Sequence, residues 1–358
     1  MVSKKIQIGL IGLGDMGLGH MECLKLFPHV AVVALCDSDK KRLKTASGRL
    51  KKPAKLFSSY QKLLAEKDLE AVFVSLPNFL HAPVGLAVLK SGKHLFLEKP
   101  LAHTVADAKK LLATAKKSDL IFQVGHVYRH SPFFQTMANR VAADAIGKPV
   151  LIWCHEFRQP FPQRDWFYDR KKSGGTFIEK NCHHFDLFNW FANDRPKQVC
   201  AFADLRVLKS GTKISCSYCP DGPKVLKKNN TIDNGWAMVE YRHGAKANLG
   251  LCMFVRPPRE IWRGLELGII GSNGKILIGN VDFGVMTLYG GSKKEEQMKI
   301  KNPHEGKWHS GMVEEHEAFL HAIRKGKKSL KSVQTAYDAV VLGAGAEQSA
   351  KKGKIILV

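Results

Sequence analysis

IQIGLIGLGDMG, residues 6–17, is the stretch that decides the fold. It opens with an apolar run that predicts a buried strand, then breaks into Gly12-x-Gly14-x-x-Gly17 and continues as a helix. In such a turn the first glycine permits a tight bend, the second lets backbone approach a pyrophosphate, and the third lets the helix pack against the strand. We therefore expect a dinucleotide at this helix start, in contact with the residues of the turn: Gly12, Leu13, Gly14, Asp15, Met16 and Gly17.

A second apolar run, residues 30–36, ends in Asp37, twenty residues after Gly17. A carboxylate at this spacing can accept hydrogen bonds from ribose hydroxyls, so Asp37 and its neighbour Ser38 are candidate cofactor contacts. Asp37 would repel a 2′-phosphate and therefore favours NAD. NADP stays an alternative, because the cations of residues 40–42 could accept a phosphate if the loop turned them inward.

The length and composition of the chain limit the number of domains and the class of protein. The 358 residues suffice for about two domains, and no apolar run is long enough to cross a membrane. MVSKK leads straight into the first strand without a signal peptide, which favours a cytoplasmic protein. The eight cysteines are scattered, as expected of reduced thiols, and Cys216-x-x-Cys219 has no second pair at zinc spacing. We expect no metal.

The formal net charge of +24 suggests at first sight that the protein binds nucleic acid. The lysines, however, are spread over expected helices and loops instead of forming one patch, and a solvated surface explains that better. Such a field would still favour anionic ligands, including the cofactor. We expect a small-molecule substrate, with nucleic acid and membrane partners disfavoured.

Residues 1–125 alternate short apolar runs with amphipathic segments, which predicts an N-terminal Rossmann domain: α/β, with a doubly wound parallel sheet. Ligands bind such sheets at the carboxyl ends of the strands. Besides the glycine turn, two polar clusters follow expected strands there, Pro77-Asn78 and Glu98-Lys99.

The sequence pattern of residues 126–358 differs from that of residues 1–125. Strand after strand between residues 198 and 290, flanked by helices, predicts an α+β domain with an open, mostly antiparallel sheet, for substrate binding and oligomerisation. We expect the last helix near 333–351, where it could pack back on the first domain. Residues 209–232 have few buried-type side chains and suggest a mobile loop.

Four motifs together resemble the glucose–fructose oxidoreductase / inositol dehydrogenase / rhizopine catabolism (Gfo/Idh/MocA) family. They are the glycine turn followed by His20, Pro77-Asn78-x-x-His81, Glu98-Lys99-Pro100, and Gly174-Gly175 followed by Glu179-x-x-x-His183. The resemblance covers essentially the whole chain. It implies a Rossmann domain plus a C-terminal α/β domain whose open sheet commonly forms a dimer contact, so we expect a homodimer or homotetramer. It also implies oxidation or reduction of secondary hydroxyls of sugars or cyclitols with NAD or NADP.

Carried over by motif, Lys99 matches the catalytic lysine and His183 the histidine that acts as general base. Glu179 stands where the family usually has Asp, and a spacing of four places its side chain on the helix face of His183. The resemblance also makes Pro77, Asn78, His81, Glu98 and Lys99 candidate cofactor contacts. His184 is interpreted as structural.

The chemistry follows from the residue types. When hydride leaves a carbinol carbon, the hydroxyl proton needs an acceptor, for which an imidazole is suited, and the Lys99 ammonium would stabilise charge on the oxygen. Glu179 would orient His183 or hold a neighbouring hydroxyl. The polar and aromatic residues nearby are candidate walls of the substrate site: Arg158, Arg164, Trp166 and Lys180.

Two alternatives share the fold. One is a glycosidase-type enzyme that oxidises, eliminates and re-reduces with retained NAD. The other is a non-catalytic sensor of sugar or nucleotide, which the presence of both Lys99 and His183 disfavours.

Overall fold

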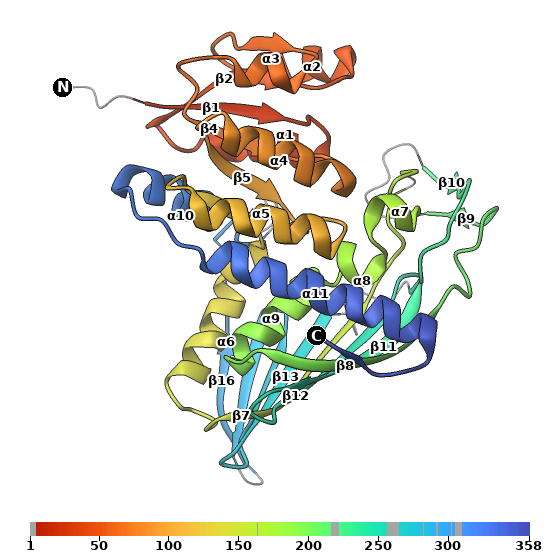
Figure 1. The fold of residues 1–358 in the computed structure, drawn as a ribbon. Helices are drawn as coiled ribbons and strands as arrows, with labels where there is room; N and C mark the ends of the chain where they lie inside the picture. The colour runs from red at the N-terminus through yellow and green to blue at the C-terminus, as the bar shows by residue number, and fades with distance from the viewer. Residues whose placement is uncertain are drawn as a thin grey trace. The chain divides into compact units, whose positions relative to one another are not determined.

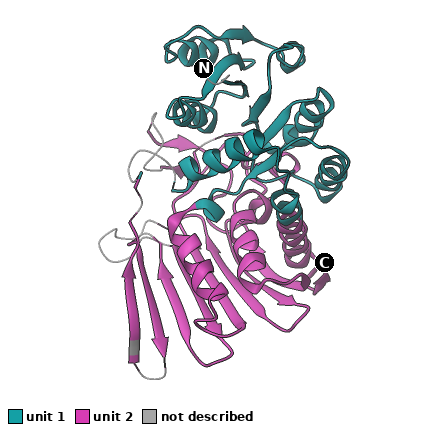
Figure 2. Ribbon diagram, turned by 90° about the vertical axis from the view of Figure 1, so that its left-hand side faces the viewer, with its two compact units in different colours: residues 1–130, 304–337 teal, residues 131–303, 338–358 magenta. Residues whose placement is uncertain are grey.

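The computed structural model describes residues 5–162, 164–215, 222–255, 265–281, 283–290, 293–301, 303–304 and 310–358. The chain forms two compact units (Figure 2). Unit 1 contains Met1–His130 and His304–Tyr337, and unit 2 contains Ser131–Pro303 and Asp338–Val358. The chain therefore leaves unit 1 after its Rossmann-type segment and returns to it near the C-terminus.

Unit 1 has a six-stranded parallel sheet in the order β3-β2-β1-β4-β5-β6 (Figure 1). This is the predicted doubly wound sheet, with the order reversing between β1 and β4. The strands are β1 (Ile6–Ile11), β2 (Val30–Cys36), β3 (Lys55–Phe57), β4 (Ala71–Val74), β5 (His94–Glu98) and β6 (Phe122–Gly125). The helices are α1 (Asp15–Leu24), α2 (Lys40–Ser47), α3 (Tyr60–Leu64), η1 (Asn78–Leu80), α4 (His81–Lys90), α5 (Val105–Lys117), η2 (Val127–His130) and α10 (Met312–Lys325).

The core of unit 1 joins segments that are far apart in sequence. Ile8 and Leu10 of β1 pack with Phe73 of β4 and Phe96 of β5. Phe319 of α10 completes this cluster from the far end of the chain, and α10 also lies against α1. Burial of these side chains is what draws residues 312–325 into the first unit.

Unit 2 has a nine-stranded sheet in the order β16-β15-β14-β13-β7-β12-β11-β8-β17. All neighbours run antiparallel except β7 and β12, so the prediction of a mostly antiparallel sheet is confirmed. The strands are β7 (Pro149–Phe157), β8 (Pro196–Asp204), β11 (Asn234–Tyr241), β12 (Lys246–Cys252), β13 (Leu265–Gly271), β14 (Ile276–Asn280), β15 (Val285–Gly290), β16 (Lys293–Lys299) and β17 (Ile356–Leu357). The helices are α6 (Pro132–Ala142), α7 (Arg170–Ser173), α8 (Thr176–Glu179), α9 (Cys182–Ala192) and α11 (Lys331–Lys352), whose first residues belong to unit 1.

Three details differ from the sequence-based expectation. β16 was missed because KKEEQMK reads as a solvated charged segment. Within residues 209–232, a two-stranded sheet forms from β9 (Lys213–Ile214) and β10 (Lys224–Val225), and it buries Ile214 and Leu226. Cys216 and Cys219 lie outside the described residues. The expected single helix over Glu179 and His183 is two helices, α8 and α9, separated at Lys180-Asn181.

No helix among the described residues has the length and apolar character needed to cross a bilayer. The described part of the chain also contains no cluster of His, Cys, Asp or Glu suited to a metal ion.

Candidate functional site

The glycine turn of unit 1 has the geometry that its spacing predicts. Gly12 has a φ of 90°, and a Cβ there would collide with the carbonyl of Ser75. A Cβ on Gly17 would collide with the carbonyl of Gly12, so α1 can approach β1 only at a glycine. Gly14 precedes the first turn of α1, and a Cβ placed on it would meet nothing within 4 Å. The helix start therefore faces open space, which fits a pyrophosphate.

Asp37 follows β2, and its carboxylate is buried against the glycine turn. Oδ2 accepts the Leu13 N–H at 2.8 Å, and Oδ1 accepts the Asp39 N–H at 2.9 Å. Two carboxylate oxygens offer about four acceptor positions. Asp37 thus orders the turn and keeps acceptor positions for a ribose. The Arg42 guanidinium is 4.0 Å away, while Asp39 caps α2 through the Lys41 N–H.

His81 lies inside unit 1. Its Nδ1 is 2.7 Å from the Pro100 carbonyl and its Nε2 is 2.8 Å from the Leu76 carbonyl. Burial lowers the pKa of His81. The ring therefore joins the turn after β4 to the turn after β5, where the Lys99–Pro100 peptide is cis. Asn78, at the start of η1, is also buried.

Lys99 directly follows β5 and is partly exposed. Glu98 is buried, and its carboxylate is directed toward the interior: Oε1 lies 2.8 Å from Nε2 of His20, and Oε2 accepts the Lys99 N–H at 3.1 Å. The structure thus shows that Glu98 contacts His20, the histidine that follows the glycine turn in the motif. The sequence analysis named Glu98 as a candidate cofactor contact and His20 only as part of the family motif, and it did not predict this link.

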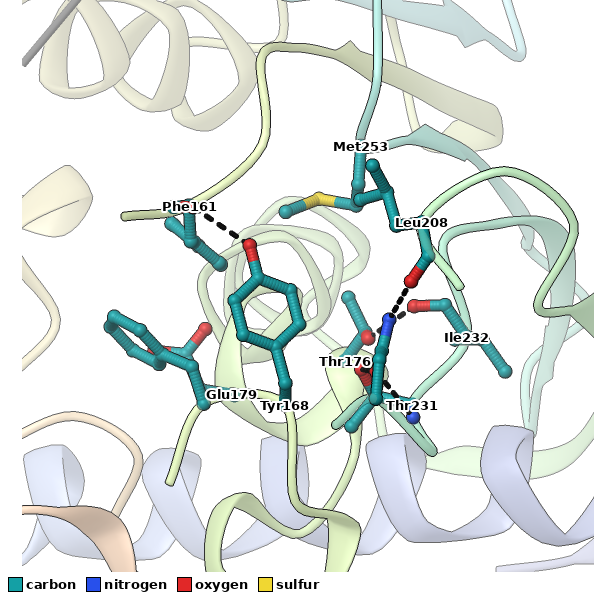
Figure 3. A pocket seen from close by; sticks show the side chains of 10 residues that line it. Phe161, Tyr168, Thr176, Glu179, Leu208, Thr231, Ile232 and Met253 are labelled. Atoms are coloured by element: carbon teal, nitrogen blue, oxygen red, sulfur yellow. Dashed lines mark hydrogen bonds between the residues drawn. The ribbon is translucent and has the colours of Figure 1, made fainter. Parts of the chain in front are cut away.

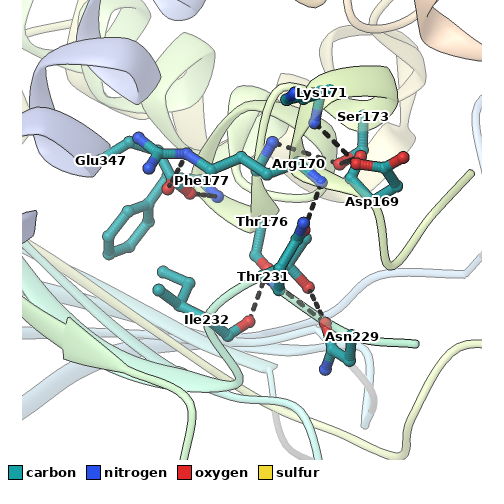
Figure 4. Close-up of polar contacts among 12 residues, drawn as sticks. Asp169, Arg170, Lys171, Ser173, Thr176, Phe177, Asn229, Thr231, Ile232 and Glu347 are labelled. Atoms are coloured by element: carbon teal, nitrogen blue, oxygen red, sulfur yellow. Dashed lines mark hydrogen bonds and ion pairs between the residues drawn. The ribbon is translucent and has the colours of Figure 1, made fainter. Parts of the chain in front are cut away.

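In unit 2, Glu347 of α11 holds the start of α8 (Figure 4). Its Oε1 accepts the Phe177 N–H at 3.1 Å, and its Oε2 lies 3.3 Å from Nε of Arg170. Burial raises the pKa of Glu347, while Arg170 and the backbone N–H groups of α8 oppose the rise. A Cβ on Gly175 would collide with this carboxylate. The Gly174-Gly175 pair therefore makes room for a buried acid that caps the helix carrying Glu179.

A second buried acid, Glu156 of β7, lies between two residues that flank His183 in sequence. Its Oε1 is 3.2 Å from Nζ of Lys180, and its Oε2 accepts from Nε2 of His184 at 3.1 Å. Burial raises the pKa of the Glu156 carboxyl, but the Lys180 charge, the His184 hydrogen bond and Arg158 outweigh burial and hold it well below its usual range. Lys180, a predicted wall residue of the substrate site, forms an ion pair with Glu156.

His184 is fully buried, as its structural interpretation implies. Burial lowers the pKa of His184 and keeps the ring neutral, so Nε2–H donates to Glu156 and Nδ1 accepts from the Asn181 amide at 3.2 Å. Asn181 stands at the break between α8 and α9. The break is thus tied to the central strand of the sheet.

Glu179 and His183 are both buried, at 4% and 7% exposure. Glu179 borders a cavity of about 20 Å³ together with Tyr168, Thr176, Thr231 and Met253 (Figure 3). The neighbouring polar groups bond to backbone: Tyr168 donates to the Phe161 carbonyl and Thr176 to the Ile232 carbonyl. A cavity of this size holds about one water molecule, so it is not a sugar site.

The other predicted wall residues are stacked on aromatic rings. The Arg158 guanidinium lies 4.3 Å from the centre of the Phe161 ring, and that of Arg164 lies 5.3 Å from the centre of the Phe167 ring. Trp166 packs on Phe167 with ring centres 4.1 Å apart. Because Phe161 also stacks on Phe167, with ring centres 4.9 Å apart, these side chains form one cluster in unit 2.

Sequence reasoning missed Glu156 and Glu347. A signal existed for Glu156, because the buried side of β7 reads Ile152, Cys154, Glu156, which places an acid on the core face of a central strand. For Glu347 the signal was an acid in an otherwise small and apolar stretch of α11.

Comparison with known proteins adds to this geometry. Residues 6–126 match the oxidoreductase family with an NAD-binding Rossmann fold, and residues 134–277 match the Gfo/Idh/MocA C-terminal domain. The chain belongs to the Gfo/Idh/MocA oxidoreductase family. It is therefore an NAD-dependent oxidoreductase with a Rossmann domain and the family's second domain.

Three related proteins match this chain over nearly its whole length. Myo-inositol 2-dehydrogenase of Thermotoga maritima is 24% identical over 355 residues, which cover 98% of each chain. The structure of levoglucosan dehydrogenase with NADH and levoglucosan superposes with a TM-score of 0.83 at 18% identity, covering 99% of this chain and 100% of that one. GenD2 from gentamicin A biosynthesis, in complex with NAD, gives a TM-score of 0.80 at 20% identity, covering 100% and 97%. These likenesses show a shared fold.

Proposed function

We propose that this protein interconverts a secondary hydroxyl and a carbonyl on a sugar, sugar derivative or cyclitol, with Lys99 and His183 as the acid–base pair. The observation that carries the proposal is the position of Lys99 at the carboxyl edge of the sheet. β5 lies two strands from β1, and neighbouring strands are about 4.8 Å apart. A dinucleotide whose pyrophosphate lies at the β1 turn and whose adenosine lies at Asp37 extends its nicotinamide toward β5.

Bound NAD supplies the hydride acceptor. Lys99 then hydrogen-bonds the reacting oxygen and stabilises its developing charge, and His183 takes the hydroxyl proton. Glu179 acts on His183 or on a neighbouring hydroxyl. The buried carboxylates of Glu156 and Glu347 position the helices that carry these two residues.

The proposed substrate class is based on the names of the related proteins. The names of the matched proteins include inositol dehydrogenases and levoglucosan dehydrogenase, which act on polyhydroxylated rings by name. We extend that class, and no single substrate, to this chain.

The decisive test is turnover on a panel of cyclitols and aldoses with NAD, followed at the reduced-nicotinamide absorbance. Lys99→Met and His183→Asn each remove an acid–base group and should lower kcat by about 10²- to 10⁴-fold while NAD still binds. The matched controls are Lys90→Met and His243→Asn, which change exposed residues and should retain activity. Activity that survives both site substitutions would overturn the proposal.

The same panel separates the alternatives. Cleavage of glycosides without net accumulation of NADH would select the redox-cycling glycosidase. Binding of NAD and sugar without any turnover would select the sensor.

We also propose that unit 2 mediates a homodimer or homotetramer through the face of the sheet opposite α9. This face carries exposed apolar side chains on neighbouring strands: Leu151, Phe202, Trp236 and Met238. Apolar surface on adjacent strands is typical of a protein–protein contact. A second copy of the chain is the partner that the family resemblance implies.

A further inference from the structure

A shallow groove in unit 1 lies between α2 and β3, the outermost strand of the parallel sheet. Its volume is about 440 Å³, within the range of ligand-binding clefts. Its lining residues come from α2, from the residue that caps the end of this helix and from β3: Lys40, Leu43, Lys44, Ser47, Gly48 and Leu56. None of them is among the residues that we propose to contact NAD or to act in the reaction.

Two leucines supply the apolar part of this groove. Leu43 is buried and also packs in the core of unit 1, whereas Leu56 is 48% exposed. A single exposed leucine is ordinary on a protein surface. Here, however, it borders a concave site, where a partner side chain could cover it and gain free energy by doing so.

The chain around the groove is strongly basic. Residues 40–55 contain eight of the 56 lysines and arginines of the chain and no acidic residue, and all eight are exposed. Arg42 forms an ion pair with Asp39, and Lys55 forms one with Glu66. In the part of the chain that the structure describes, the other six form no ion pair: Lys40, Lys41, Lys44, Arg49, Lys51 and Lys52.

The packing of α2 keeps the cations at the rim of the groove. Leu43 and Ala46 face the core of unit 1 and hold the helix in place. Lys40 and Lys44 lie one turn apart on one face of the helix, and both border the groove. Like charges at this spacing destabilise a helix, so an anionic group bound beside both ammonium groups would relieve the repulsion.

We propose that this groove is a docking site for a short acidic segment of a partner protein. A leucine or similar apolar residue of the segment packs on Leu43 and Leu56, and flanking carboxylates lie at the Lys40 and Lys44 ammonium groups. The site adds a partner to the protein and does not depend on the proposed reaction.

The shape and charge of the groove favour this occupant over three others. A second copy of the chain is disfavoured, because 56 basic against 32 acidic residues make two copies repel each other. A flat bilayer is disfavoured, since the apolar residues lie within a concave site. A nucleic acid is disfavoured, since the lining residues include no aromatic ring on which a base could stack.

The test uses two synthetic peptides and the full-length protein. One fluorescent peptide has glutamates on both sides of a leucine, and the other has serine in place of that leucine. Fluorescence anisotropy should show that the leucine peptide binds more tightly, because only this peptide covers the apolar part of the groove. Binding of both peptides should weaken as the salt concentration rises.

Two substitutions separate the charged rim from the apolar part. Lys44→Glu should weaken binding of both peptides at least about tenfold, and Lys44→Gln should weaken it less. Leu56→Gln should weaken binding of the leucine peptide about fivefold and leave the serine peptide unaffected. The matched controls are Lys109→Glu on α5 and Leu26→Gln, which change exposed residues of unit 1 and should alter the affinity less than about twofold.

Three results would overturn the proposal. The first is no peptide binding at low salt, and the second is equal weakening by the site variants and their controls. The third is binding of a single-stranded oligonucleotide or of phosphatidylserine vesicles that Lys44→Glu and Leu56→Gln abolish while peptide binding persists. These measurements contain no substrate, so their outcome is separate from the fate of the proposed reaction.

Discussion

Asp37 has an observed role in the fold and a proposed role in binding the cofactor. Its carboxylate accepts from Leu13 and Asp39 and so orders the glycine turn and the start of α2. We propose that the same negative charge faces the adenosine ribose and would repel a 2′-phosphate, which is the basis for proposing NAD over NADP.

Asp37→Asn should therefore change cofactor choice more than it changes the fold. The amide keeps an acceptor for one backbone N–H and loses the charge, so the NAD-to-NADP ratio of kcat/KM should fall at least about tenfold, corresponding to about 1.4 kcal/mol. Asp39→Asn is the control, because asparagine also caps α2. An unchanged ratio in Asp37→Asn would contradict this role.

At the residue scale, residues that belong to a short sequence motif could be predicted. The residues that hold those motif residues in place could not. Lys99 and His183 stand in short local patterns, whereas Glu156 meets Lys180 and His184 only through the fold. The contact between His20 and His316 of α10 was missed for the same reason, since the two residues lie at opposite ends of the chain. The core face of β7 marks Glu156 as a buried acid, but no local pattern shows which distant side chains it meets.

At the element scale, α8 depends on an acid from α11. Glu347 accepts from the first N–H groups of α8 and contacts Arg170, which starts α7 (Figure 4). Glu347→Leu would leave buried N–H groups unpaired, at a cost of about 1–3 kcal/mol in unfolding free energy.

This substitution should also lower kcat, because the end of α8 carries Glu179. Glu347→Gln keeps the acceptor and should lose less of both. Thermal unfolding and kinetics of the two variants, with Gln348→Leu on the exposed side of α11 as control, check the expectation. Equal behaviour of Glu347→Leu and the control would refute the capping role.

The same scale shows why some elements could be predicted. β2 and β4 are uninterrupted apolar runs, and β1 and β5 are mostly apolar; each is followed by turn residues, as expected of a buried parallel strand. β16 is charged along its length and forms because β15 offers it an edge. The break between α8 and α9 is set by Asn181 and its bond to His184, a contact that helical periodicity cannot reveal.

At the scale of the whole molecule, the exposed face of the unit 2 sheet is the surface through which we propose that copies associate. Trp236 of β11 lies on this face, 47% exposed, with its ring over Gly250. Trp236→Lys should place a charge in the contact and shift the protein to monomers in light scattering. Leu26→Lys, at an exposed position of unit 1, should leave the oligomer intact. A wild-type protein that is monomeric at all concentrations would contradict the proposal.

The proposed reaction requires the Lys99 and His183 side chains to meet at one reacting oxygen of the substrate. A crystal structure with NAD and a substrate from the active panel measures this directly. We expect the Lys99 Nζ and a ring nitrogen of His183 each within about 3.2 Å of the reacting oxygen or of its proton path. Side chains bound to different parts of the ligand, more than about 10 Å apart, would contradict the acid–base pair, since proton transfer needs hydrogen-bond contact.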